Sequence, residues 1–367
     1  MSRQHTRLFG PNKFKLGMFG QNCNNGLTMT KAPEAWDNAW DNNVKAARLA
    51  DDAGVEFILP IGRWHGYKGD TDTEGTTYET LTWATGLLAS TKEICVCGTL
   101  HVRFLNPVFA AKQMVTADHV GQGRFGLNIV SGWNVGEHEM FGIELLHHDI
   151  RYDLTEEWVR VVKRIWTEDE PFDFDGKYFK LRDVLLKPKP WGGSHPILIS
   201  AGNSREGRGF GARHVDCLFT SIVQDADLPA YLAEARTVGS AEGRSPGIYA
   251  SGHMYARPTA KEARDFYHYI VHDNGDWRAA EHAAHIRTAG RETPFAKLQA
   301  LKERLISGLG TWPIVGSYDE CAAEFKRLSD AGLDGMALGL VNYIDEFPHF
   351  MEVVGRMEKA GLRLPAR

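Results

Sequence analysis

The residue most suggestive of chemistry in this sequence is Asn128, a polar amide inside an otherwise apolar run. Residues 125–130 read Phe-Gly-Leu-Asn-Ile-Val, between a glycine-rich segment and Ser131-Gly132. A short apolar run between such turns is typical of a buried parallel strand. A buried amide left without a hydrogen-bond partner costs about 1–3 kcal/mol. A bound ligand is a natural partner, so the strand end at Asn128 is our first candidate for a functional site.

A second candidate is the turn at residues 201–204, Ala-Gly-Asn-Ser, where a helix is predicted to begin. Small residues expose backbone N–H groups at the positive end of the helix dipole, and Ser204 adds a hydroxyl. This pattern predicts a phosphate site with Gly202 and Ser204, although a plain N-cap is the alternative. Arg151 and Tyr152, at another predicted helix start, either serve the same phosphate or form a solvated helix end.

The other candidate residues follow the ends of predicted strands and include few carboxylates. They are Gln21, Gly62, Arg63, Trp64, His101, Arg103, Phe104, Trp133 and Tyr255. The sequence has no close acid pair of the glycosidase kind, no zinc-binding spacing and no G-x-S-x-G motif. Amides, aromatics and arginines suit a large planar, partly anionic cofactor that brings its own reactivity. For His101, a structural role stays open beside a role in the pocket.

These side chains can act together only in a fold that brings the strand ends close to one another, and the sequence predicts such a fold. Apolar strands are expected at 14–19, 57–60, 94–100, 125–130, 196–200, 217–220, 248–254 and 335–340. Helices are expected at 40–53, 78–89, 107–119, 153–166, 204–214, 228–238, 259–271, 318–331 and 347–360. Eight strands in βα order, without a G-x-G-x-x-G motif after the first, predict an α/β fold of the (β/α)8 TIM-barrel type rather than a doubly wound sheet. Its active site is expected at the carboxyl ends of the strands.

We expect residues 1–367 to form a single barrel domain. Two segments are additions to the minimal barrel. Residues 172–179 predict a hairpin centred on Asp175-Gly176. Residues 272–308 contain His272, His282 and His285 with few strand signals, and we interpret them as an insertion that forms a lid.

Composition narrows the class of protein. The 367 residues are 43% hydrophobic and carry a formal net charge of −5, which argues against a nucleic acid or an anionic membrane as partner. Five cysteines without a metal-like repeat indicate free thiols. No apolar signal core or long apolar run is present, so we expect a cytoplasmic protein.

Several of these stretches together resemble a known family. Residues 123–133 with Glu137, 149–152, 186–190 and 200–204 are similar to the bacterial luciferase-like flavin monooxygenases. Within that family they resemble the branch that holds pyrimidine (uracil), dimethyl sulfone and dibenzothiophene sulfone monooxygenases. The resemblance extends over residues 15–340. It implies a TIM barrel that uses reduced FMN from a separate NAD(P)H:flavin reductase and activates O2, with a flavin-N5 peroxide as the expected oxidant.

The resemblance also assigns residues to roles. It implies flavin contacts at Gly62, Arg63, Asn128, Glu137, Arg151, Tyr152 and Ser204, and the small-residue turn at 201–204 adds Gly202. Where the pyrimidine enzymes have a small hydroxyl residue after strand three, this chain is expected to have Phe104. Asn128, His101 and Arg103 are the predicted catalytic residues, and Gln21, Trp64, Phe104, Trp133 and Tyr255 are predicted to line the substrate pocket.

The leading hypothesis is a two-component, FMNH2-dependent monooxygenase for a sulfone, sulfonate or heterocyclic amide. One alternative is a deazaflavin (F420)-dependent dehydrogenase, for which the sequence lacks an extended basic groove. Another is a flavin-binding protein without turnover. A homo-oligomer, either a dimer or a tetramer, is expected from the resemblance only.

Overall fold

The computed structural model describes residues 6–202, 204–220, 226, 228–288 and 293–365. Eight of the described strands form the barrel: β1 (Lys15–Phe19), β2 (Phe57–Leu59), β3 (Cys95–His101), β4 (Phe125–Val130), β7 (Ile197–Ser200), β8 (Cys217–Thr220), β9 (Gly247–Arg257) and β11 (Gly335–Gly339). Neighbouring strands pair in parallel in this order, and β11 pairs with β1 to close the ring. The predicted TIM barrel is therefore confirmed.

The barrel strands are buried on both sides, which explains their continuous apolar sequence. Inside the ring, Phe57, Phe219 and Tyr249 pack edge to face or stacked, beside Cys95 and Cys217. Gly17 on β1 makes room for this packing, because a Cβ there would lie 2.2 Å from the Phe57 ring. All five cysteines are buried free thiols, as the sequence predicted.

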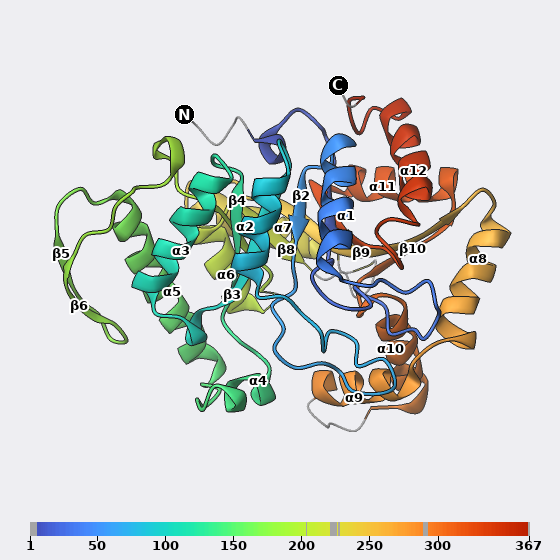
Figure 1. Cartoon of the computed structure of the whole chain (residues 1–367), viewed down its shortest axis with the longest axis horizontal. Helices are drawn as coiled ribbons and strands as arrows, with labels where there is room; N and C mark the ends of the chain where they lie inside the picture. The colour runs from blue at the N-terminus through green and yellow to red at the C-terminus, as the bar shows by residue number, and fades with distance from the viewer. Residues whose placement is uncertain (1–5, 203, 221–225, 227, 289–292, 366–367) are drawn as a thin grey trace.

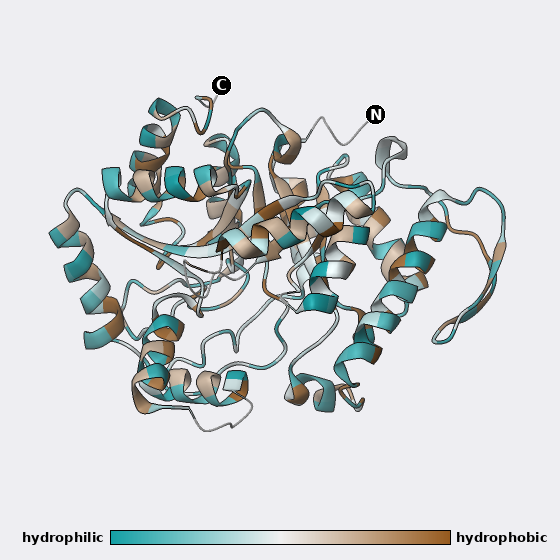
Figure 2. Ribbon diagram, turned by 180° about the vertical axis from the view of Figure 1, so that it is seen from behind, coloured by the Kyte–Doolittle hydropathy of each residue, from teal (hydrophilic) through white to brown (hydrophobic). Residues whose placement is uncertain are grey.

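Helices surround the barrel, and each shows both hydrophobic and hydrophilic residues in Figure 2. They are α1 (Trp40–Asp52), α2 (Thr80–Ser90), α3 (Pro107–Val120), α4 (Val135–Met140), α5 (His148–Thr167), α6 (Arg205–His214), α7 (Leu228–Ala241), α8 (Ala260–His268), α11 (Tyr318–Ala331) and α12 (Phe347–Lys359). The sequence pattern did not predict α4, and it placed the start of α5 five residues late because the first turn is polar. No helix in the described ranges has the length and hydropathy needed to cross a bilayer.

Strand β10 (Trp312–Ser317) was also not predicted. It pairs in parallel with the second half of β9 only, so it extends the sheet outside the closed ring. Pro313 lies within this strand, and an edge strand tolerates a residue that cannot donate a hydrogen bond.

The predicted insertion at 272–308 is helical in its described part. It contains α9 (Trp277–Thr288) and α10 (Phe295–Gly308), which pack with Leu27 and Met29 of the loop after β1 in a second hydrophobic cluster. Asp276 accepts hydrogen bonds from the backbone of Asp70 and Thr71, which ties α9 to the loop after β2. In Figure 1 these helices and α4 lie at one end of the barrel, and both chain ends lie at the other. That the segment acts as a lid stays a prediction.

The hairpin also forms, from β5 (Phe172–Asp175) and β6 (Lys180–Val184), and projects at the side of the barrel (Figure 1). Its turn is longer than the predicted Asp175-Gly176 pair. The carboxylate of Glu157 on α5 accepts hydrogen bonds from the backbone of Lys177, Tyr178 and Phe179, which fixes this wider turn.

Candidate functional site at the carboxyl ends of the strands

Asn128 lies at the mouth of the barrel and lines a cavity of about 190 Å³. It pairs in register with Thr99 on the neighbouring strand β3. The Asn128 amide nitrogen donates to Thr99 Oγ1 at 3.3 Å, and that hydroxyl donates in turn to the carbonyl of Pro60 at 2.7 Å.

This chain of hydrogen bonds fixes the orientation of the Asn128 amide. Because the hydrogen of the Thr99 hydroxyl is already given to Pro60, Thr99 can only accept from Asn128, and the NH2 group must face it. Asn128 Oδ1 then points elsewhere, and it is buried without a partner. A buried carbonyl oxygen in this state has room for one N–H or O–H donor from a ligand.

The predicted phosphate residues line a second cavity of about 360 Å³, which includes Ser131, Arg151, Tyr152, Gly202 and Ser204. Ser204 is the N-cap of α6, and its Oγ accepts from the backbone N–H of Gly207 at 3.0 Å. Ser204 therefore caps the helix and also lines the cavity. Asn203, the remaining residue of the predicted turn, lies outside the described residues.

Tyr152 approaches the turn closely. A Cβ added to Gly202 or Gly207 would lie 2.8 or 2.5 Å from the Tyr152 hydroxyl, so glycine is needed at both positions. Burial raises the pKa of Tyr152, against the effect of hydrogen bonds with Ser204 and Ser131, and keeps the phenol protonated as a donor. Arg151 donates to the carbonyl of Gly132, while its buried Nε has no partner.

Arg63 is the centre of a buried charge cluster that we define as Arg63, Tyr67, Glu74 and Glu137. Its guanidinium donates to Glu74 Oε2 at 2.6 Å, to Glu137 Oε1 at 3.2 Å and to the Tyr67 hydroxyl at 2.9 Å. Both carboxylates are fully buried, and each keeps one oxygen, Glu74 Oε1 and Glu137 Oε2, without a partner.

His101 lies beside this cluster, with Nε2 4.0 Å from Glu137 Oε2. Burial, with Arg63 and His138 nearby, lowers the pKa of His101 to about 3. The imidazole is therefore neutral at physiological pH and offers a hydrogen bond rather than a charge.

Aromatic side chains form the wall of a third cavity, of about 330 Å³, that also includes Gly62, Thr99 and His101. Phe104 stacks on Phe141 of the segment after α4 at a centroid distance of 4.1 Å, and Trp64 meets Phe141 edge to face at 4.9 Å. Thr99 lines this cavity and also holds Asn128, and Arg63 lines both this cavity and the Asn128 cavity.

Comparison with known proteins shows which family this chain belongs to. The model of luciferase-like monooxygenases matches residues 14–335. The chain belongs to the luciferase-like monooxygenase family. It is 30% identical over 345 residues to an FMNH2-dependent dimethylsulfone monooxygenase of Pseudomonas putida, covering 92% of this chain and 93% of the relative. It is 25% identical over 366 residues to a pyrimidine monooxygenase of Allorhizobium ampelinum, covering 95% and 98%.

The fold agrees with this membership. The crystal structure of DmoA from Hyphomicrobium sulfonivorans superposes with a TM-score of 0.85 at 18% identity, over 95% of this chain and 89% of that one. Like other luciferase-like monooxygenases, this oxidoreductase therefore places its strand-end residues at the mouth of a TIM barrel.

Not every predicted site residue of this luciferase-like monooxygenase lines one of the three cavities. Tyr255 is buried in the second hydrophobic cluster, where its hydroxyl donates to the carbonyl of Ser307 at 2.7 Å. Arg103, Gln21 and Glu137 also lie outside the residues that line the three cavities. Arg103 Nε, both amide atoms of Gln21 and Glu137 Oε2 are buried without hydrogen-bond partners. The strand that carries Tyr255 extends beyond the closed ring, which the sequence pattern could not reveal.

The structure adds residues that the sequence pattern did not single out. Thr99 supplies a hydroxyl inside β3, and Phe104 follows that strand; that Phe104 stands where the pyrimidine enzymes have a hydroxyl residue stays a prediction. Glu74, Tyr67 and Arg287 line the Asn128 cavity from segments distant in the sequence. A polar Thr99 within the apolar run 95–101 was a usable signal; the other three lie in a loop and a helix, where polar residues are ordinary.

Proposed function

We propose that this protein is a two-component monooxygenase that uses reduced FMN and O2 to oxygenate a small sulfone, sulfonate or heterocyclic amide. The observation that supports it most is that the Asn128 cavity and the Tyr152–Ser204 cavity adjoin at Ala201, which lines both. One end offers a buried amide oxygen that lacks a donor, and the other offers hydroxyls, a guanidinium and a helix N-terminus. This is the order of groups that a flavin ring and its ribityl phosphate require.

These residues fit FMN. Tyr152, Ser204 and Arg151 would hold the phosphate, because a phenol, a helix-capping hydroxyl and a guanidinium are all donors to oxyanions. Asn128 and Gly62 would hold the ring side, with Arg63 and Glu137 behind them. Reduced FMN, when bound, would supply two of the four electrons that the reduction of O2 consumes, and the oxygenated substrate would supply the other two.

The residues of the chain orient the reactants and exclude water. Thr99 fixes the Asn128 amide, the neutral His101 donates or accepts one hydrogen bond, and the aromatic wall of Trp64, Phe104 and Phe141 keeps the third cavity apolar. A separate NAD(P)H:flavin reductase, a homo-oligomeric state and a cytoplasmic location are part of the same proposal.

An anaerobic titration tests the cofactor. Reduced FMN is added to the purified protein, binding is followed by fluorescence, and O2 consumption is then measured with a flavin reductase and a panel of sulfones, sulfonates and cyclic amides. We expect tight binding and substrate-dependent O2 consumption. Hydride transfer to F420 without O2 would favour the dehydrogenase instead, and binding without any O2 consumption would indicate a flavin-binding protein.

A further inference from the structure

We propose that Asn128 makes the site selective for reduced over oxidised FMN, because its oxygen is fixed as an acceptor for the N5–H that the flavin ring gains on reduction. The inference rests on the proposed function, which places the flavin ring at Asn128. It deepens that function by naming the residues that select the oxidation state of the cofactor. Asn128 would contact the cofactor, and Thr99 would be a positioning residue that acts through Asn128.

The two oxidation states of FMN differ at N5 of the central ring. Oxidised FMN has a lone pair at N5 and accepts a hydrogen bond there, whereas reduced FMN has an N–H and donates one. N1 also gains a proton on reduction but loses it near neutral pH. The N3–H and the ring carbonyls are present in both states. A protein group that faces N5 can therefore distinguish the two states.

An amide side chain can act as such a selector only if its orientation is fixed. Asparagine carries an NH2 donor and a carbonyl acceptor of similar size and shape, and half a turn about its last side-chain bond exchanges them. A freely rotating asparagine would offer its NH2 group to N5 of oxidised FMN and its oxygen to the N5–H of reduced FMN. It would therefore bind both states.

In this protein, neighbouring groups fix the orientation of Asn128. The backbone of Pro60 offers only a carbonyl, so the Thr99 hydroxyl donates its one hydrogen to it, at 2.7 Å. Thr99 Oγ1 can then only accept, and it accepts from Asn128 Nδ2 at 3.3 Å. Thr99 is held in turn by the Thr80 hydroxyl, which accepts from its backbone N–H at 3.0 Å and donates to its carbonyl at 2.6 Å. A rotated Asn128 would place two oxygens together without a hydrogen between them.

The Asn128 oxygen is consequently left as a free acceptor. Asn128 is only 7% exposed and lines the cavity, and its Oδ1 has no partner within the described part of the chain. An N–H at N5 would satisfy this oxygen, whereas the lone pair of oxidised N5 would leave it unsatisfied and repel it. Glu74 Oε1 is a second unpaired acceptor of a residue that lines the cavity. The N3–H that suits a carboxylate is present in both states, so Glu74 would not discriminate between them.

Selection of the reduced state suits a protein that receives its flavin from a separate reductase. Oxidised FMN would leave the site after each turnover, and the site would then be open to another reduced molecule. The deazaflavin F420 has a carbon in place of N5, so the fixed acceptor gives it no hydrogen bond in either state. Sites built to hydrogen-bond an N–H strongly reject analogues that lack it, and a tenfold difference is the least we expect.

Anaerobic titrations of the purified protein test the selection. Isothermal titration calorimetry gives dissociation constants for FMN, reduced FMN and the two states of 5-deaza-FMN, in which a carbon replaces N5. We expect reduced FMN to bind at least tenfold more tightly than FMN, and the two states of 5-deaza-FMN to bind within threefold of each other. The reduction potential of bound FMN should then lie above that of free FMN by about 30 mV for each factor of ten. Equal affinities for the two states of FMN, or the same preference in the 5-deaza pair, would overturn the proposal.

Thr99→Val separates selection from affinity. It frees the Asn128 amide to rotate, so that the NH2 group can serve N5 of oxidised FMN. We expect oxidised FMN to bind at least fivefold more tightly than it does to the wild type, while reduced FMN stays within twofold. Thr99→Ser keeps the hydroxyl and should retain the wild-type preference. An unchanged preference in Thr99→Val, or an equal loss of affinity for both states, would contradict the positioning role of Thr99.

Thr30→Val is the matched control. Thr30 is also buried, its hydroxyl donates to the carbonyl of Ile270 at 2.9 Å, and it lies outside the lining of the three cavities. This variant should keep the wild-type preference. If Thr99→Val fails to fold, the 5-deaza-FMN pair still decides the proposal in the wild type. A protein that binds neither state of FMN would fail the proposed function, whereas one that binds both equally would fail only this inference.

Discussion

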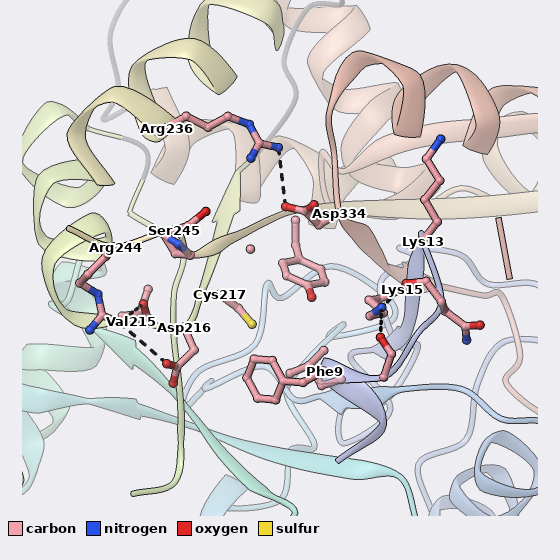
Figure 3. A pocket seen from close by; sticks show the side chains of 16 residues that line it. Phe9, Lys13, Lys15, Val215, Asp216, Cys217, Arg236, Arg244, Ser245 and Asp334 are labelled. Atoms are coloured by element: carbon pink, nitrogen blue, oxygen red, sulfur yellow. Dashed lines mark hydrogen bonds and ion pairs between the residues drawn. The ribbon is translucent and has the colours of Figure 1, made fainter. Parts of the chain in front are cut away.

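Cavities lie at both ends of the barrel, and the charged side chains at the two ends differ in whether they have partners within the protein. At the amino ends of the strands a cavity of about 510 Å³ is lined by six charged side chains: Lys13, Lys15, Asp216, Arg236, Arg244 and Asp334. Figure 3 shows Arg236 directed at Asp334 and Arg244 at Asp216. Lys15 donates to the carbonyl of Gly10, and Lys13 pairs with Asp330. Each charged group there has a partner in the protein.

The carboxylates at that end also stabilise the strands. Asp216 accepts from the backbone N–H of Leu198, and Asp334 accepts from that of Ile248 at 2.7 Å. At the mouth, by contrast, Asn128, Glu74 and Glu137 each keep a buried oxygen without a partner. Arg244 Nε at the amino ends is also buried without a partner, so it is unpaired acceptor oxygens, rather than cavity size, that distinguish the candidate site from the structural crevice.

Asn128→Ala should produce the largest effect on function. Removing a preorganised hydrogen-bonding group at the reacting centre typically lowers a rate by roughly 10²–10³-fold. We expect a loss of this size in substrate-dependent O2 consumption, with a small change in the urea unfolding midpoint. Comparable losses in rate and stability would show that Asn128 is structural and would break the contrast between the two ends.

Asp334→Ala tests the opposite end. It leaves the N–H of Ile248 without its acceptor, so we expect a loss of about 1–3 kcal/mol in the free energy of unfolding. FMN affinity and turnover should stay within twofold of wild type. A defect in flavin binding without a loss of stability would mean that the cavity at the amino ends of the strands takes part in function. That result would contradict the structural role assigned to Asp334.

Ser204→Ala separates capping from phosphate binding. The loss of the bond to the Gly207 N–H should cost about 1 kcal/mol, and FMN affinity should fall roughly tenfold. Ser317→Ala is the matched control, because Ser317 caps α11 in the same way through the Glu320 N–H. We expect equal losses of stability and a weaker FMN affinity only for Ser204→Ala; equal FMN affinities would mean that Ser204 is a cap alone.

The smallest expected effect concerns pH. The pKa of His101 is lowered to about 3, so the folded state binds its proton less readily than the unfolded chain. Its contribution to stability is fully present above about pH 6.5 and is lost as the pH falls toward 3. His101→Gln should therefore lose less stability than wild type between pH 7 and about 5.5, by roughly 1 kcal/mol. His253, also with a pKa lowered to about 3, stays as a second source of acid sensitivity in both proteins.

By itself, the sequence determined the barrel and singled out the turn at which a phosphate site is predicted. Apolar runs of strand length alternate with amphipathic segments, and that local pattern is enough to place eight strands and most helices. The turn at 201–204 and the amide at Asn128 are likewise short-range signals, since each stands out from its immediate neighbours.

Only the tertiary structure decided which polar residues meet. Glu74 and Arg287 lie in a loop and an inserted helix, far apart in the sequence, yet they line one cavity with Asn128. Folding of the chain also buried Tyr255 in the second hydrophobic cluster and paired the charges at the amino ends of the strands. Whether a side chain is satisfied depends on partners brought by chain folding, and no local pattern encodes those partners.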